Sequence, residues 1–274
     1  MEKFIFAALM PAAILFMCSA TAISQDGKKM TSAYYFAHED DDVDVVAKIT
    51  ADLRAGKEVF CIWMTNGNKA GDAAVRENET RSVMKLLGVP EDHLIFLGFP
   101  DQEAYMRIPE IVNSLSAVLE KIKPDEFMSH AYEGGNIDHD TVALTSAIVT
   151  KKLNIPVHYD FPDNNVYNGQ TCIWKFLPGS PTPVQYTKMD AQLFDLKSKV
   201  IKLYKSQATS LNAYWLTSDK ASFKKNGEPY RVAPDYDFTK PPAAEFRYNS
   251  TSRGKATIEM FLAAVSDYLS KNPL

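Results

Sequence analysis

The residues best placed to do chemistry are an acidic run that begins with a histidine. The run His38–Asp42 (HEDDD) directly follows an apolar stretch that predicts a strand over 32–37, and it opens a predicted helix over 43–53. Acidic runs are usually solvated turns or first turns of helices, where the helix dipole favours negative charge. Here the position between strand and helix brings the side chains together at the end of a sheet. His38 and the aspartate three residues after it can both reach one borderline metal ion, because Zn²⁺ accepts imidazole and carboxylate ligands together.

A second loop of the same kind supplies candidates for a third ligand. Catalytic zinc sites usually have three protein ligands and one water, so another residue must come from elsewhere in the chain. The stretch 129–140 (SHAYEGGNIDHD) follows a predicted strand and precedes a predicted helix, and it holds two of the five histidines. A single histidine is more often structural than a ligand. Two such loops at one sheet edge favour a metal site.

The elements that position these loops alternate between short apolar runs and helical patterns. Strands are predicted over 32–37, 58–64, 93–98, 126–129 and 155–159, and helices over 43–53, 73–87, 108–122 and 141–152. This alternation is typical of α/β proteins with a parallel sheet. Chemistry in such sheets lies at the carboxyl ends of the strands, which is where both loops fall.

The last third of the chain has a different pattern. Residues 161–183 are rich in Pro, Gly and Asn and predict a long surface excursion, and 226–242 is Pro-rich and irregular. Helices are predicted over 191–211 and 257–269. No internal repeat and no glycine-rich nucleotide-binding loop is found in the sequence.

Composition is that of a globular protein. The 274 residues are 46% hydrophobic and 23% charged, which excludes a wholly disordered chain. The net charge of −4 argues against a broad nucleic-acid-binding face, so no nucleic-acid partner is expected.

The N-terminus has the pattern of a secretory signal peptide. Lys3 is followed by the apolar run 4–17 and by the small residues 19–22, which predicts cleavage after Ala22. The apolar run is shorter than the ~20 residues that a membrane-spanning helix needs. A lipoprotein signal ending at Cys18 is disfavoured by Met17 before it. We therefore expect a signal peptide over 1–22, one domain over 23–274, no membrane span after cleavage, and a secreted or periplasmic protein.

Two cysteines remain in the mature chain. Cys61 and Cys172 could pair in an oxidising compartment, but nothing in the sequence places them close together, and two buried free thiols are at least as good an interpretation.

Several short motifs resemble one known family. The run His38–Asp42 resembles the AHPDDE signature of the PIG-L/LmbE-like family of N-acetylglucosaminyl-phosphatidylinositol de-N-acetylases, and Asn136–His139 (NIDH) stands where that family has HPDH. Further similarity lies at 65–67 (TNG), at Arg76 with Glu79, at 97–101 (LGFPD) and at 130–135 (HAYEGG). The resemblance covers about residues 31 to 160, with weaker similarity at 204–207 and 236–242.

The resemblance implies a fold, a cofactor and a reaction. The fold would be Rossmann-like, with a mostly parallel sheet between two layers of helices. One Zn²⁺ would be bound by His38, Asp41 and His139, and the reaction would be hydrolysis of the N-acetyl group of an amino sugar. Asp40 would be the general base, since adjacent residues in a turn point different ways and Asp40 can face the water while Asp41 faces the metal.

The sequence departs from the family motifs at two positions, and the resemblance also suggests residues that contact the substrate. Glu39 replaces the family's Pro, and Asn136 replaces the first His of HPDH, which would help to stabilise the oxyanion; losing one such partner can cost ~10²–10³ in rate. His130 would substitute for it only if its loop folds back. By resemblance Arg76 is a substrate contact, or else it pairs with Glu79. Asp101 either binds a sugar hydroxyl or forms a turn, and Tyr132 is a candidate to stack on a sugar.

Two functional classes follow. The first is a secreted zinc-dependent deacetylase acting on an N-acetylated amino sugar or glycoconjugate, and the second is a carbohydrate-binding protein with little turnover because of Asn136. The presence of Asp40 favours the enzyme, since a binding protein needs no base beside the metal. Hydrolysis of another amide would use the same residues. The sequence does not give the substrate or the oligomeric state.

Overall fold

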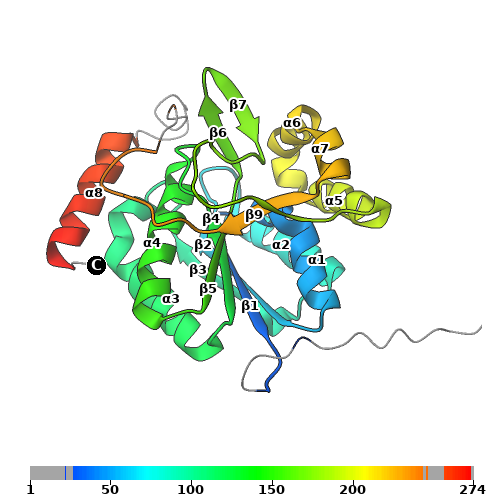
Figure 1. The fold of residues 1–274 in the computed structure, drawn as a ribbon, viewed down its shortest axis with the longest axis horizontal. Helices are drawn as coiled ribbons and strands as arrows, with labels where there is room; N and C mark the ends of the chain where they lie inside the picture. Colours follow the sequence, from blue (N-terminus) through cyan, green and yellow to red (C-terminus); the bar gives the residue numbers. More distant parts are fainter. Residues whose placement is uncertain (1–21, 23–26, 243–244, 246–255, 273–274) are drawn as a thin grey trace, which may run out of the picture.

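The computed structural model describes residues 22, 27–242, 245 and 256–272. Its main sheet has seven strands in the order β3-β2-β1-β4-β5-β9-β8 (Figure 1). The first five in this order are parallel: β3 (Leu94–Phe99), β2 (Glu58–Thr65), β1 (Thr31–Phe36), β4 (Glu126–His130) and β5 (Val157–Phe161). The strands β9 (Glu228–Val232) and β8 (Gln185–Thr187) extend the sheet in antiparallel pairing.

Helices cover both faces of the sheet. One layer holds α3 (Ile108–Ile122), α4 (Ile137–Leu153) and α8 (Ile258–Lys271), and the other holds α1 (Val46–Arg54), α2 (Ala73–Leu87) and α5 (Ala191–Leu203) (Figure 1). Each layer encloses its own apolar cluster against the sheet. Every residue of β1 is buried, as expected of a parallel strand between two helical layers. This confirms the predicted Rossmann-like fold.

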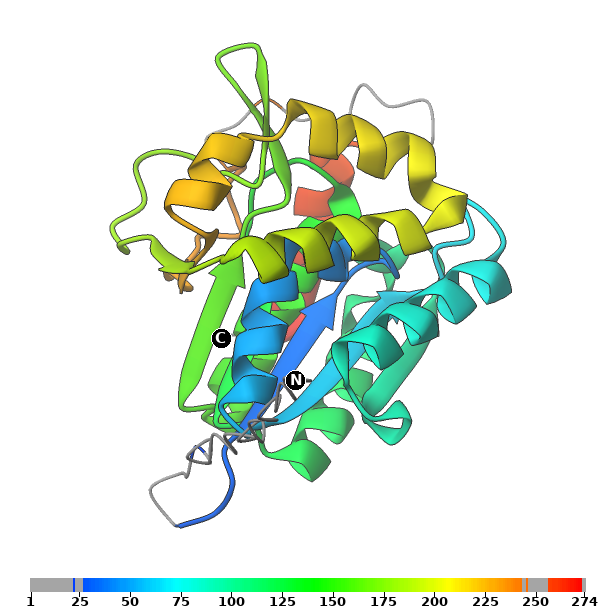
Figure 2. The ribbon, with the colours of Figure 1, turned by 90° about the vertical axis from the view of Figure 1, so that its right-hand side faces the viewer.

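Short elements complete the fold. The 3-10 helices are η1 (Asp41–Val45), η2 (Glu91–His93), η3 (Ala104–Arg107) and η4 (Lys205–Gln207). A hairpin is formed by β6 (Asn164–Tyr167) and β7 (Gln170–Ile173), and α6 (Ala208–Thr217) and α7 (Lys220–Lys225) follow α5. Figure 2 shows α6 above the end of the sheet toward which the strand arrowheads point.

Capping residues explain which helix boundaries the sequence predicts well. Helix α2 spans the predicted 73–87 because Asp72 accepts hydrogen bonds from the first turn and Gly88 ends the helix at a φ of 92°, a left-handed conformation suited to glycine. Helix α3 also has the predicted bounds. Helix α4 starts four residues earlier than predicted, at Ile137, because the side chain of Asn136 caps it.

The last third of the chain differs from the predictions. The expected surface excursion over 161–183 contains the β6–β7 hairpin, and the expected irregular segment contains β9. The predicted helix over 191–211 is two helices, because Tyr204 leaves the helical conformation with a ψ of 69° and its buried hydroxyl donates to Asp42.

The predicted signal peptide lies outside the described residues except for Ala22. The backbone N–H of Ala22 donates to the Ala55 carbonyl, and the Ala22 carbonyl accepts from the Met30 N–H, so this last residue of the predicted signal peptide contacts the domain. Cys61 is buried in β2 and Cys172 is half-buried in β7, and both are free thiols. Among the described helices, none is long and apolar enough to cross a membrane.

Candidate metal centre and its cavity

The two loops singled out in the sequence meet at the centre of the sheet edge. The strands β1 and β4 are neighbours, and the connections that leave them run toward opposite sides of the sheet. Such a reversal of strand order opens a crevice at the carboxyl ends of the strands. The segment after β1 enters it through η1, and the segment after β4 enters it at the start of α4.

His38, Asp41 and His139 come together in this crevice. His38 Nδ1 lies 3.4 Å from Asp41 Oδ2 and 3.2 Å from His139 Nε2, and His139 Nε2 lies 3.5 Å from Asp41 Oδ1. All three side chains are buried, and they are close enough to hold one metal ion. Two imidazoles and one carboxylate are a donor set that suits Zn²⁺.

Backbone and side-chain donors fix the carboxylate of Asp41. Its Oδ2 accepts from the N–H groups of Ala37 at 3.1 Å and His38 at 2.7 Å. His130 Nε2 lies 3.0 Å from the same oxygen. Burial alone would raise the pKa of Asp41, but the surrounding histidines lower it well below its usual range. The group is therefore a carboxylate, which is the form that binds metal.

Outer carboxylates orient both histidines. His139 Nδ1 lies 3.0 Å from Asp163 Oδ2, so its other nitrogen, Nε2, is directed to the centre of the cluster. His38 Nε2 lies 3.2 Å from Asp138 and 3.3 Å from Asp101, which leaves Nδ1 for the cluster. Carboxylates behind ligating histidines are a recurrent feature of protein zinc sites, because they fix the tautomer and the ring orientation. Although His38, Asp101 and Asp138 are also within metal-binding reach of one another, we interpret the two carboxylates as this support.

The carboxylates around His38 and His139 also determine the charge of these two histidines. Burial would lower the pKa of His139, but Asp41 and Asp163 raise it to about 10. His38 behaves in the same way, and its pKa is raised well above the usual value. A metal ion entering the cluster would therefore replace protons held by these two rings.

Asp40 faces the same cavity and is held by Arg76. Its Oδ1 accepts from Arg76 Nη2, while Arg76 Nη1 donates to the carbonyl of Gly67 at 3.0 Å and Arg76 Nε lies 3.5 Å from Glu39. Burial raises the pKa of Asp40 above its usual value, although Arg76 opposes the rise. Gly67 has a φ of 58°, and a Cβ there would lie 2.2 Å from the Glu39 carboxylate, so the glycine permits this close packing.

Asn136 both caps α4 and lines the cavity. Its Oδ1 accepts from the Asp138 backbone N–H at 2.9 Å, which leaves Nδ2 as a donor. Because Oδ1 caps the helix, Nδ2 is the atom of the amide that remains for a ligand.

The cavity has a volume of about 110 Å³ and holds most of the predicted site residues. His38, Asp40, Asp41, Arg76, Asp101, Asn136 and His139 all line it. The expected alternative for Arg76, an ion pair with Glu79, is not formed, because Glu79 accepts hydrogen bonds from Ser206 instead.

His130 and Tyr132, the two remaining site candidates from the sequence, do not line this cavity. His130 is 1% exposed and its ring stacks on that of His139 with centroids 4.1 Å apart, so it supports the cluster from behind. Burial, together with the proximity of His139, lowers the pKa of His130 to about 4. Tyr132 packs against Phe238 and Phe261 in an apolar cluster, and its hydroxyl donates to the Lys240 carbonyl at 2.9 Å.

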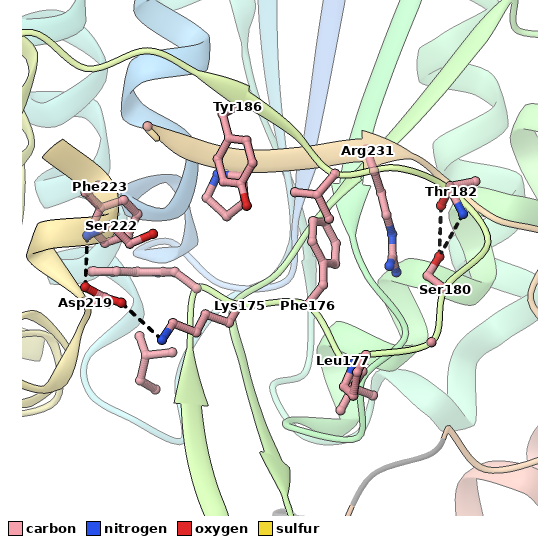
Figure 3. A pocket seen from close by; sticks show the side chains of 17 residues that line it. Lys175, Phe176, Leu177, Ser180, Thr182, Tyr186, Asp219, Ser222, Phe223 and Arg231 are labelled. Carbon is pink, nitrogen blue, oxygen red and sulfur yellow. Dashed lines mark hydrogen bonds and ion pairs between the residues drawn. The ribbon is translucent and has the colours of Figure 1, made fainter. Parts of the chain in front are cut away.

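Several lining residues are absent from the sequence-based set. Asp44 belongs to η1, Asp163 follows β5, and Gln207, Ser210 and Tyr214 come from η4 and α6. Asp163 could have been found by the rule that located His38–Asp42, since it lies two residues after the end of a strand and begins the polar stretch 163–165 (DNN). A separate cavity of about 340 Å³ lies between α7 and β9, and its polar side chains largely pair with one another, as Lys175 does with Asp219 (Figure 3).

Comparison with known proteins finds one matching family model. The family model for GlcNAc-PI de-N-acetylase, PIG-L, matches residues 34–151, from β1 to the last turn of α4. Over these residues the chain is similar to the PIG-L family. The match includes both loops that form the metal cluster. No curated protein sequence matches the chain.

Solved structures of this fold include deacetylases. Teicoplanin deacetylase in a zinc inhibited form is 13% identical with a TM-score of 0.62, and the alignment covers 76% of this chain and 100% of that one. N,N'-diacetylchitobiose deacetylase from Pyrococcus horikoshii is 20% identical with a TM-score of 0.53, covering 74% and 84%. A 4-carboxy-2-hydroxymuconate hydratase from Pseudomonas putida KT2440 is 13% identical with a TM-score of 0.52, covering 79% and 98%. Because one fold carries different reactions, the chemistry must be argued from the residues of the site itself.

Proposed function

We propose that this protein is an exported, zinc-dependent deacetylase that hydrolyses the N-acetyl group of an amino sugar or glycoconjugate. The observation that carries the proposal is the cluster of His38, Asp41 and His139 with Asp40 beside it in one cavity. The similarity to deacetylases of teicoplanin and of diacetylchitobiose supports the reaction type.

The zinc proposal rests on the donor set and its outer carboxylates. His38, Asp41 and His139 would hold the ion, and Asp138 and Asp163 would orient the two imidazoles. When bound, the ion would supply Lewis acidity toward the acetamide carbonyl and the attacking water.

The protein's own groups would handle the protons. Arg76 holds Oδ1 of Asp40, which leaves Oδ2 to accept a proton from the attacking water. Asp40 would then deliver that proton to the amide nitrogen as the C–N bond breaks, so that acetate and a free amine leave. Asn136 Nδ2 would donate to the carbonyl oxygen as negative charge develops on it.

The alternative function is a carbohydrate-binding protein with little turnover. It is motivated by Asn136, a neutral donor at a position where the family has a histidine. The ion pair that holds Asp40 in the cavity favours the enzyme, because sugar binding alone requires no oriented base. Binding of N-acetylated sugars without acetate release would support the alternative.

Acetate release from a panel of N-acetylated sugars, with and without chelator, tests the proposal. Asp40→Asn should lower turnover by ~10²–10⁴, the usual contribution of a general base, and should leave the zinc content nearly unchanged. Asp41→Asn should instead lose zinc, since a neutral amide oxygen is a poor zinc ligand. Equal zinc loss in both variants would show that the two roles are assigned wrongly, and chelator-resistant activity would exclude zinc dependence.

Export is proposed from the N-terminal pattern alone. The mature chain should begin near Ile23, which N-terminal sequencing of protein from the medium or periplasm would measure. Retention of Met1 in that material would contradict cleavage.

A further inference from the structure

Asp44 is a buried carboxylate in the wall of the metal cavity that the proposed reaction does not use. It lies in η1 beyond Asp41, is 4% exposed, and lines the cavity together with His139. Its Oδ1 accepts from Trp174 Nε1, which holds the carboxylate in place. Within the described residues its Oδ2 has no hydrogen-bond partner. A buried polar atom without a partner is costly, so this oxygen calls for a donor from a bound molecule.

Asp163 places a second carboxylate beside it. One oxygen of Asp163 is engaged by His139 Nδ1 at 3.0 Å, and the side chain lines the same cavity. Burial, and after it the nearby carboxylates of Asp163 and Asp41, raise the pKa of Asp44 well above its usual value, although Lys197 opposes the rise. Asp44 and Asp163 belong to different segments of the chain. A cation or a hydrogen-bond donor bound at this wall would offset that effect and favour the carboxylate form of Asp44.

The rest of the cavity has an excess of negative charge. Asp40, Asp41 and Asp101 also line it, whereas Arg76 is its one Lys or Arg in the described part of the chain. Arg76 is engaged by Asp40 and by the Gly67 carbonyl, so it is not available to an anionic ligand. Carboxylates remain in excess even when one divalent cation is counted with Arg76.

We propose that Asp44 and Asp163 form a subsite that binds a hydrogen-bond donor of the substrate, a hydroxyl or an ammonium group, and that the cavity rejects anionic sugars. The inference rests on the proposed function for the nature of the substrate and names its class: neutral or cationic amino sugars rather than phosphorylated ones. Asp163 also orients His139, so Asp44 is the residue that reports on the subsite alone.

Binding of sugars that the enzyme cannot hydrolyse tests the subsite without turnover. The probes are D-glucosamine, which carries an amine and hydroxyls, D-glucose, which carries hydroxyls only, and D-glucosamine 6-phosphate, which adds an anion. Their dissociation constants are measured by calorimetry with zinc-loaded wild type and Asp44→Asn. The control is Asp195→Asn, the same charge change at an exposed position of α5. Zinc content is measured in every sample.

The wild type should bind D-glucosamine at least about 10-fold more tightly than its 6-phosphate. Asp44→Asn should weaken D-glucosamine binding roughly 10-fold or more, as expected for a lost hydrogen bond to a charged group, with zinc retained and Asp195→Asn unchanged. An equal loss with D-glucose identifies the donor as a hydroxyl, and a loss confined to D-glucosamine identifies it as the ammonium group.

Three results would overturn the subsite: equal affinities of wild type and Asp44→Asn for both neutral and amino sugar, tighter binding of the 6-phosphate by the wild type, or no binding of any probe at millimolar concentration. The acetate assay separates this outcome from failure of the proposed function. Asp44-dependent binding without acetate release would reject the deacetylase and keep the subsite. Acetate release with unchanged binding by Asp44→Asn would reject the subsite alone.

Discussion

At the residue scale, the site is defined by which nitrogen of each histidine faces the cluster. His38 presents Nδ1 and His139 presents Nε2, and in each ring the other nitrogen meets a carboxylate. Asp138 and Asp163 therefore determine which ring nitrogen of each histidine faces the metal cluster. Asp138 lies within the residues that match the PIG-L family model, and Asp163 lies beyond them.

This arrangement predicts a graded loss of metal affinity at Asp163. Asp163→Asn keeps an acceptor for His139 Nδ1 but removes its charge, and Asp163→Ala removes both. Zinc affinity should fall in the order wild type, Asn, Ala, with a total loss of about 10- to 100-fold, the usual effect of removing such a partner. Competition with a chelating dye measures it. Unchanged affinity in the alanine variant would contradict the assigned role.

At the element scale, the start of α4 joins folding to the proposed chemistry. Asn136 accepts from the Asp138 N–H through Oδ1, which leaves Nδ2 as a donor, and the residue lines the cavity. An aspartate there would cap the helix as well as asparagine does but would offer no donor, and an alanine would do neither.

Two substitutions at Asn136 should therefore separate cap from donor. Asn136→Ala should lower the free energy of unfolding by ~0.5–2 kcal/mol, whereas Asn136→Asp should leave it nearly unchanged. Turnover should fall by ~10²–10³ in both, since each lacks the oxyanion donor. Urea denaturation and acetate release measure the two effects. An Asn136→Asp variant with full activity would remove Asn136 from the mechanism.

The elements that the sequence predicts correctly are those with local signals. The bounds of α2 follow from Asp72 and Gly88, which lie at its ends. β9 has no such signal, because the polar Glu228 and the proline after it do not look like a buried strand. Glu228 is nevertheless 1% exposed, since it accepts from the N–H groups of Ala47 and Lys48 and pairs with the buried Lys197. These partners are distant in sequence and cannot be read from periodicity.

At the scale of the whole molecule, the site needs more of the chain than its motifs. The loops 38–42 and 136–139 could be assigned from strand-end position and resemblance, and both lie within residues 34–151. Other lining residues of the cavity, Asp163, Gln207 and Tyr214, come from later parts of the chain. The position of α6 over the sheet depends on the break at Tyr204, whose hydroxyl reaches Asp42, and no local pattern predicts that contact.

The free energy of unfolding should depend on pH through one histidine that is not part of the metal cluster. His158 lies in β5, where its Nε2 is 2.8 Å from Ser129 Oγ of β4, and burial lowers its pKa to about 4. The unfolded chain has a histidine pKa of about 6.5, so it binds more protons than the folded protein between these values. The stabilisation is therefore complete above about pH 6.5 and is lost as the pH falls toward 4, by up to about 3 kcal/mol.

The variant His158→Gln has no group that titrates at this position. The free energy of unfolding of the wild type minus that of the variant, measured by urea denaturation, should therefore decrease as the pH falls from about 6.5 to about 4. Contributions common to both proteins, including loss of metal in acid, cancel in that difference. A difference that stays constant with pH would show that His158 is protonated as readily in the folded protein as in the unfolded chain.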